Sequence, residues 1–193
     1  MSDATEMPTV KLMTSEDLFA LPPSKKVDRW LFRGELRESK VTKRNPNHAG
    51  AVMAIGGLLC EWLKKQPKPR GKIYGGEAYF RIRKDPETNV GIDVALATAQ
   101  QVAAVKKKSS FVDGPPILAV EVLSPNDKQQ DITDSIGEYL DCGVKQVWIV
   151  DAVAETVTVY RPGHEPVLYA RSQTLPGGDD LLGFSCSVAE IFE

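Results

Sequence analysis

The chain has 193 residues, of which 42% are hydrophobic and 26% charged, and its formal net charge is −2. This composition indicates a globular protein, most simply one domain over residues 13–193 behind a loose N-terminal tail (1–12). It excludes attraction of nucleic acid by overall charge, although lysine and arginine groups in the first half leave a local phosphate-binding face open.

The cysteines, Cys60, Cys142 and Cys186, are odd in number and far apart in the sequence. This argues against a disulfide framework and against a cysteine-rich zinc site. No apolar leader lies between Met1 and Val10, and the longest apolar stretch (49–63) is too short to cross a bilayer. We therefore expect a cytoplasmic protein with no membrane partner.

In chain order, the first half predicts a short capped helix, a β-hairpin, a long helix and two strands. Their ranges are 15–20, 28–32 with 36–40, 48–65, 72–83 and 90–97. We expect Thr14 to cap the first helix and Asn47 the second, with a bulge at Gly75-Gly76.

The second half predicts a short helix, a buried strand, a helix ending at Cys142-Gly143, another buried strand, two further strands and a closing helix. Their ranges are 99–107, 117–123, 127–140, 144–150, 155–160, 167–170 and 187–192. The alternation of strands and helices in the middle of the chain predicts an α/β fold.

Two predicted strands carry a carboxylate among apolar residues. "PPILAVEVLSP" places Glu121 in a short apolar run between prolines, and "VGIDVALA" places Asp93 beside Ile92 and Val94. A buried carboxylate is costly unless a cation, a metal or hydrogen-bond donors meet it. Two acids on successive strands can meet and hold a hard divalent ion such as Mg²⁺. Alternatively, both acids form salt bridges with basic residues of the preceding strand, namely Lys72, Arg81 and Arg83.

The element order and these acids resemble the PD-(D/E)xK nuclease core and, more narrowly, the Uma-type restriction endonuclease family. The matching stretches cover nearly all of 13–192: "MTSEDLFALP", "RGELRE", His48, "GIDVALA", "PPILAVEVLSPND", "EYLDCGVKQVWIVD" and "LLGFSCSVAEIF". The resemblance implies a restriction-endonuclease-like core, a mixed central sheet flanked by helices, with an N-terminal hairpin and C-terminal strands.

The resemblance also implies that Asp93 and Glu121 bind Mg²⁺ or Mn²⁺, with Glu35 and His48 as accessory residues near the site. For Glu35 the alternative is a solvent-facing turn residue. For His48 the alternative is a residue at a helix start, satisfied by local backbone.

The chain departs from the family pattern at the catalytic lysine. Leu123 stands two positions after Glu121, where the superfamily has lysine, and Ser135 stands four residues before Tyr139, where the Uma-type family has it. Asp131, one turn earlier, matches the family. Lys128 is the nearest replacement in sequence, although it also fits an exposed residue of a first helical turn.

Other catalytic signatures are missing from the sequence. It contains no Walker-type glycine loop, no G-x-G-x-x-G after a strand and no G-x-S-x-G elbow, and its two histidines are far apart. Trp62 and Trp148 fall at core positions and need no role in stacking on bases.

Two functions follow as expectations. The first is a metal-dependent DNA endonuclease in which Asp93, Glu121 and Lys128 act on a phosphodiester, weakened by the loss of the family lysine. The second is a catalytically degenerate nuclease fold that binds nucleic acid or protein. By analogy with nucleases that cut both strands, the first function implies a homodimer.

Overall fold

The computed structural model describes residues 12–40, 46–125 and 127–193. The predicted tail therefore lies outside the described residues apart from Leu12. Lys43 and Arg44, two of the basic residues in the first half that could form a phosphate-binding face, also lie outside them. The elements are α1 (Ser15–Ala20), β1 (Val27–Phe32), β2 (Glu35–Lys40), α2 (Pro46–Lys64), β3 (Lys72–Lys84), β4 (Glu87–Ala97), α3 (Ala99–Ala104), β5 (Val112–Asp113), β6 (Leu118–Val122), α4 (Gln129–Asp141), β7 (Gln146–Asp151), β8 (Thr156–Tyr160), β9 (Val167–Ala170), β10 (Thr174–Pro176), β11 (Ser185–Ser187) and the 3₁₀ helix η1 (Val188–Ile191).

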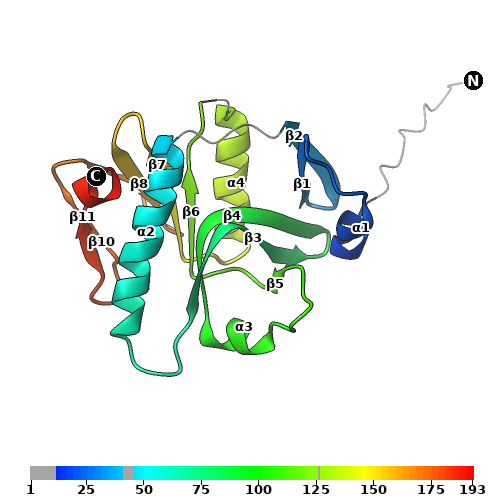
Figure 1. Ribbon diagram of the computed structural model, residues 1–193, viewed down its shortest axis with the longest axis horizontal. Helices are drawn as coiled ribbons and strands as arrows, with labels where there is room; N and C mark the ends of the chain where they lie inside the picture. Colours follow the sequence, from blue (N-terminus) through cyan, green and yellow to red (C-terminus); the bar gives the residue numbers. More distant parts are fainter. Residues whose placement is uncertain (1–11, 41–45, 126) are drawn as a thin grey trace, which may run out of the picture.

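A mixed central sheet forms the middle layer, in the order β2-β1-β4-β6-β7-β8-β9, with β3 paired to β4 and to β5. β6 and β7 run parallel and are joined through α4, while β4 is antiparallel to both β3 and β6. Helices α2 and α4 cover opposite faces of the sheet, and the β1–β2 hairpin lies at the end away from β8 (Figure 1). This confirms the predicted α/β class and the mixed sheet between helices.

The N-terminal elements form where their caps and turns predict them. Thr14 caps α1, because its hydroxyl accepts from the Asp17 N–H while the Asp17 carboxylate accepts from the Thr14 N–H. The hairpin turns at Arg33 and Gly34, whose φ angles are 51° and 79°. Two successive positive φ angles match the twist of the flanking strands, so the predicted hairpin is confirmed.

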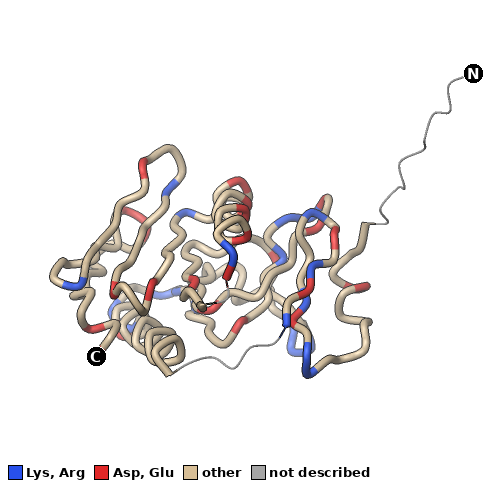
Figure 2. Tube along the Cα trace, turned by 90° about the horizontal axis from the view of Figure 1, so that it is seen from above, with Lys and Arg blue, Asp and Glu red and all other residues tan. Residues whose placement is uncertain are grey.

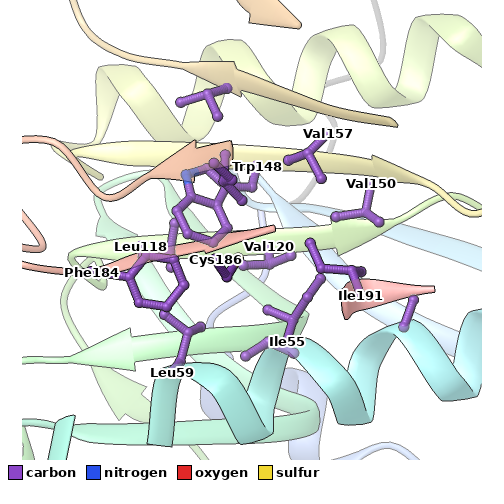
Figure 3. Close-up of a cluster of buried hydrophobic side chains, with 14 of the residues drawn as sticks. Ile55, Leu59, Leu118, Val120, Trp148, Val150, Val157, Phe184, Cys186 and Ile191 are labelled. Atoms are coloured by element: carbon purple, nitrogen blue, oxygen red, sulfur yellow. The ribbon is translucent and has the colours of Figure 1, made fainter. Parts of the chain in front are cut away.

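α2 packs on one face of the sheet through a stripe of residues four apart. Ala51, Ile55 and Leu59 are buried against strand residues that include Trp148. Figure 3 shows Ile55 and Leu59 pointing toward the strands that carry this indole. The helix begins at Pro46, so Asn47 lies within its first turn, and the prediction that Asn47 caps the helix is wrong.

The β3–β4 pair forms the floor near the hairpin. Its register shifts between Gly75 and Ala78, which confirms the predicted bulge, and Glu77 within the bulge has φ 58°. β4 begins at Glu87 rather than Val90 because its pairing with β3 continues to the turn, where Lys84 lies opposite Glu87. Residues 87–89, which lie between the two predicted strands, therefore belong to β4.

α4 covers the other face of the sheet. Ile136 and Tyr139 are buried there in a cluster that includes Ala95, Ala119 and Ile149. The helix ends at Cys142, and Gly143 takes φ 98°, the left-handed conformation that ends many helices. The predicted stop at Cys142-Gly143 is confirmed.

The C-terminal part completes the core around Trp148. β10 and β11 form a separate antiparallel pair, and Leu175, Phe184 and Val188 of this region are buried with the α2 core. The predicted closing helix is a short 3₁₀ turn, and α3 ends at Ala104 rather than at residue 107. The short strands β5, β10 and β11 were not predicted, since two or three residues carry little periodicity.

Basic and acidic residues are both spread over the described chain (Figure 2). Many of these charges are paired, as in Arg29–Glu38 at 2.7 Å and Arg81–Asp113 at 3.1 Å. No helix in the described ranges is both long enough and apolar enough to span a membrane.

Candidate functional site

The register of β4 and β6 brings Asp93 and Glu121 opposite each other. Val94 pairs with Val120, and Ala95 pairs with Ala119, in an antiparallel ladder. Continuing this register by one residue places Asp93 across from Glu121. Because side chains alternate along a strand, both carboxylates share the face of Ala95 and Ala119, which is the α4 face.

Asp93 contacts the backbone of β6 and a side chain of α2. It is 6% exposed, and its Oδ2 accepts the backbone N–H of Val122 at 2.9 Å. The same oxygen lies 3.4 Å from Nε2 of His48, a buried residue in the first turn of α2. His48 therefore faces the predicted acid rather than serving only its own helix start.

Glu121 is held from α4. The hydroxyl of Tyr139 donates to its Oε1 at 2.6 Å. Burial and the neighbouring Asp93 carboxylate raise the pKa of Glu121 from 4.5 to about 8, although the Tyr139 hydrogen bond acts in the opposite direction. Burial and the Glu121 carboxylate also raise the pKa of Tyr139 well above its usual value. The two acids thus form a pair that carries its full negative charge only with a compensating cation.

This pair lies in a cleft of about 770 Å³ between the hairpin, β3 and α4. The hairpin contributes Asp28, Arg29, Trp30, Glu38, Ser39 and Lys40, and β3 contributes Glu77 and Tyr79. The opposite wall is α4 and the segment before it, with Lys128, Asp131, Ile132, Ser135 and Ile136. A cleft of this size is in the range of about 300–1,000 Å³ that buries a small ligand.

Most of the predicted site residues meet at this cleft. Lys128, Asp131 and Ser135 line it together with Asp93 and Glu121. Lys128 is exposed, as its structural alternative predicted, but it lies at the position before α4 and not in the first turn of the helix.

The two acids predicted as accessory residues, Asp131 and Glu35, differ in location. Asp131, which lines the cleft, also lies 4.0 Å from Arg37 of the hairpin. Glu35 is exposed at the start of β2 and is not among the described residues that line the cleft. For Glu35 the alternative of a solvent-facing residue therefore fits its location.

The arginines offered as alternative partners bind other acids. Arg81 pairs with Glu87 and with Asp113, at 3.3 and 3.1 Å. Arg83 pairs with Glu138 at 2.7 Å. The third candidate, Lys72, lies over the ring of Tyr74. Within the described chain, none of the three is paired with Asp93 or Glu121, so the proposed salt bridges from β3 are not formed.

Glu138 anchors the helix that carries Tyr139. It is buried, and it accepts from Arg33 at 2.8 Å, Arg83 at 2.7 Å and Thr88 at 2.6 Å. Although burial would raise it, the hydrogen bonds from Arg83, Thr88 and Arg33 lower the pKa of Glu138 to about 2. This ion-pair network fixes α4 against the hairpin turn and β3, and so fixes the wall of the cleft.

Among the residues that line the cleft, Tyr139, Glu77 and Trp30 were not predicted as site residues. Tyr139 served only as an inward-facing helix position and as the reference point for the family lysine; its place four residues after Ser135, on the face of α4 toward the cleft, was the available signal. Glu77 reaches the cleft from the bulge, which packs so closely on Gly91 that a Cβ there would lie only 3.2 Å from the Glu77 carbonyl oxygen. The sequence gave no indication that Trp30 is a site residue, because aromatic residues are common in β-strands for packing alone.

A preformed metal cage is not evident among the described residues. In residues 12–40, 46–125 and 127–193, no three His, Cys, Asp or Glu side chains gather closely enough to hold one ion. Asp93 and Glu121 nevertheless offer carboxylate oxygens, the donors that Mg²⁺ and Mn²⁺ prefer, and Mg²⁺ sites often contain only one or two carboxylates. The donor set therefore fits a hard divalent ion with open coordination positions.

A solved structure shares this fold. The chain is similar to the crystal structure of a putative nuclease belonging to DUF820 from Anabaena variabilis, with a TM-score of 0.74 and 16% sequence identity. The likeness covers 92% of this chain and 96% of that one. At this identity it shows the fold alone.

The sequence comparison defines the family. The profile of the Uma2 family, described as "Putative restriction endonuclease", matches residues 15–189. The chain belongs to this family, as the resemblance in its sequence predicted. No protein with curated function matches the chain.

Proposed function

We propose that the cleft is a metal-dependent endonuclease site that hydrolyses phosphodiester bonds of DNA. The observation that carries this proposal is the Asp93–Glu121 pair, which faces the cleft from adjacent strands with the pKa of Glu121 raised to about 8. The arginines of β3, Arg81 and Arg83, pair with Glu87 and Glu138. Membership of the Uma2 family supports the same chemistry.

Asp93 and Glu121 would hold Mg²⁺ or Mn²⁺. When bound, such an ion supplies Lewis acidity toward a phosphoryl oxygen and its attacking water. The Val122 N–H fixes Oδ2 of Asp93, and the Tyr139 hydroxyl fixes Oε1 of Glu121. Both carboxylates therefore reach the ion with little loss of side-chain freedom.

Lys128 is the cation that we assign to the charge developing on phosphate. It lines the cleft ahead of α4, and no ion pair holds it within the described chain. A preorganised charge at this point stabilises the transition state more than the ground state. His48, 3.4 Å from Oδ2 of Asp93, positions that carboxylate.

A second candidate is a catalytically degenerate nuclease fold that binds nucleic acid or protein. Ser135 favours it, because a hydroxyl lines the cleft where the family resemblance implies a lysine. Without that lysine, cleavage would be slower by about 10²–10³-fold, by analogy with removal of one oxyanion-hole donor. In this case the cleft keeps its shape and its affinity for metal but loses most of its rate.

The first experiment is Mn²⁺ binding by calorimetry, because metal binding requires no knowledge of the substrate. We compare the wild type with Asp93→Asn and with a control, Glu155→Gln, whose carboxylate pairs with Arg171 on the surface. Binding that disappears only in Asp93→Asn supports the metal site. Absence of binding in folded wild type contradicts it.

The second experiment is cleavage of supercoiled plasmid DNA in Mg²⁺ or Mn²⁺. Nicking that is lost in Glu121→Ala and retained in Glu155→Gln supports the endonuclease. Metal binding without cleavage, by contrast, favours the degenerate fold.

A further inference from the structure

Trp30 differs from the other tryptophans in its surroundings. The indole N–H of Trp62 donates to the Leu182 carbonyl at 2.9 Å, and that of Trp148 donates to Oε1 of Gln146 at 3.1 Å. Among the described residues, nothing accepts the N–H of Trp30. A tryptophan that is packed only for stability usually satisfies this donor. Trp30 is half-buried and lines the cleft, so its ring is available to a ligand.

The other aromatic residues of the cleft are already engaged through their polar groups. The Tyr79 hydroxyl donates to the Arg29 carbonyl at 2.6 Å, and the Tyr139 hydroxyl donates to Glu121. Among the aromatic side chains of the cleft, Trp30 therefore offers both an apolar ring and an N–H donor that no described residue accepts. Because a base has a flat apolar face and polar edges, it matches these two features.

Two lysines lie at the walls of the same cleft. Lys40 ends β2, and Lys128 precedes α4. Neither forms an ion pair within the described chain, whereas the remaining cleft cation, Arg29, is paired with Glu38 at 2.7 Å. Unpaired ammonium groups on two walls can hold the phosphates of a strand that passes between them.

The dimensions of the cleft limit what can reach its floor. Its volume of about 770 Å³ suits a ligand of one or two nucleotides. Asp93 at the floor is only 6% exposed. A nucleotide within a duplex would have to leave the stack to reach such a floor, whereas an unpaired strand need not.

We propose that the cleft binds a single, unpaired nucleic-acid strand, with a base stacked on Trp30 and its phosphates between Lys40 and Lys128. This inference rests on the proposed function in that it assigns a substrate class to the same cleft. It identifies Trp30 as a binding residue that neither the family resemblance nor the candidate metal ligands indicate. We expect the cleft to prefer an unpaired strand over a duplex. The test distinguishes a DNA strand from an RNA strand.

The test is fluorescence anisotropy with fluorescein-labelled oligo(dT) and oligo(U) of about ten nucleotides, and with a DNA duplex of the same length. Ca²⁺ is present as a hard cation. Wild type should bind at least one of the single strands about tenfold or more tightly than the duplex. Comparison of oligo(dT) with oligo(U) distinguishes DNA from RNA.

Trp30→Leu should weaken binding of the single strand about tenfold, because base–aromatic stacking is lost. Trp30→Phe retains an aromatic face and should keep most of the affinity, which a merely structural role would not require. Equal affinity of wild type and Trp30→Leu, tighter binding of duplex, or no binding of either single strand overturns the inference. If Trp30→Leu does not fold, we measure instead how far the strand quenches the tryptophan fluorescence of the wild type. Trp30→Phe should lose that quenching, and persistence of the quenching overturns the inference.

The two proposals fail separately. If strand binding depends on Trp30 but the protein binds no Mn²⁺, the proposed nuclease is contradicted and the strand site is supported. If Mn²⁺ binding depends on Asp93 but strand affinity does not change in Trp30→Leu, the strand site is contradicted and the metal site is supported.

Discussion

The Tyr139 hydroxyl donates a 2.6 Å hydrogen bond to the Glu121 carboxylate across the gap between α4 and β6. The same carboxylate faces Asp93 on β4, and the pKa of Glu121 is raised to about 8. Near neutral pH the folded protein therefore holds a proton at a position where the unfolded chain holds none. This arrangement makes stability depend on pH.

Stability should fall as pH rises from about 4.5 to about 8. Below this window both states bind the proton, and within it the unfolded state releases the proton of Glu121 first, so ionisation favours unfolding. Glu121→Gln removes the effect, and we expect it to be more stable than wild type by roughly 1–4 kcal/mol at pH 9 but nearly equal at pH 4. Urea denaturation at both pH values measures the difference. A constant difference between the two proteins at all pH values would argue against a raised pKa.

Glu138 should be essential for the stability of the α4 wall. It is buried among Arg33, Arg83 and Thr88, so Glu138→Gln leaves two guanidinium groups without their carboxylate. We expect a loss of about 2–4 kcal/mol at pH 7. Because the pKa of Glu138 is lowered to about 2, wild type should keep this contribution above pH 4.5 and lose it as pH falls toward 2.

Glu155→Gln provides the matched control for Glu138. Its partner, Arg171, lies at a similar distance of 2.7 Å, but both side chains are solvent-exposed. The cost should be about 0–1 kcal/mol because water screens the pair. Equal losses in the two variants, measured by urea denaturation, would contradict a special role for the buried network.

The sequence predicted those parts of the fold that depend on local patterns. The Thr14 cap, the Arg33-Gly34 turn and the Gly143 stop each follow from the chemistry of a few neighbouring residues. Asp93 and Glu121 were predicted to meet because a carboxylate in an apolar strand conflicts with its surroundings and because consecutive strands often pair. Their opposition in the register of β4 and β6 agrees with this expectation.

What the sequence could not provide are contacts between distant segments. Asn47 fits a cap by residue type, but α2 begins earlier, at Pro46. The partners of Arg83 could not be foreseen, because Glu138 lies 55 residues away and the choice among acids depends on tertiary packing. For the same reason Trp30 and Glu77 became cleft residues only once the hairpin and the bulge were placed beside α4.

Two glycines should respond in opposite ways to alanine. A Cβ at Gly57, exposed in the interior of α2, would meet nothing within 4 Å, so Gly57→Ala should stabilise by about 0.5–1 kcal/mol. A Cβ at Gly91 would lie 3.2 Å from the Glu77 carbonyl oxygen and 3.3 Å from the Glu77 Cβ. Gly91→Ala should therefore disturb the bulge and destabilise by roughly 1–2 kcal/mol. Thermal unfolding measures both effects. Stabilisation by Gly91→Ala would show that the bulge can shift to admit the Cβ and would contradict this prediction.

Ser135→Lys should raise nuclease activity if the site is weakened only by the loss of the family lysine. Ser135 lines the cleft with Glu121, and an ammonium group there would offset charge that develops on phosphate. We expect an increase of about 10²–10³-fold in the rate of plasmid nicking with Mg²⁺. Thr133→Lys is the control, because Thr133 is exposed on the same helix and is not among the described residues that line the cleft. It adds the same charge away from the carboxylates, so it should leave the rate within about threefold of wild type, as expected for a screened surface charge. If both variants raise the rate equally, general attraction of DNA explains the gain. If Ser135→Lys folds, binds Mn²⁺ and still cleaves no faster than wild type, the cleft lacks more than its lysine, and the degenerate fold becomes the better account.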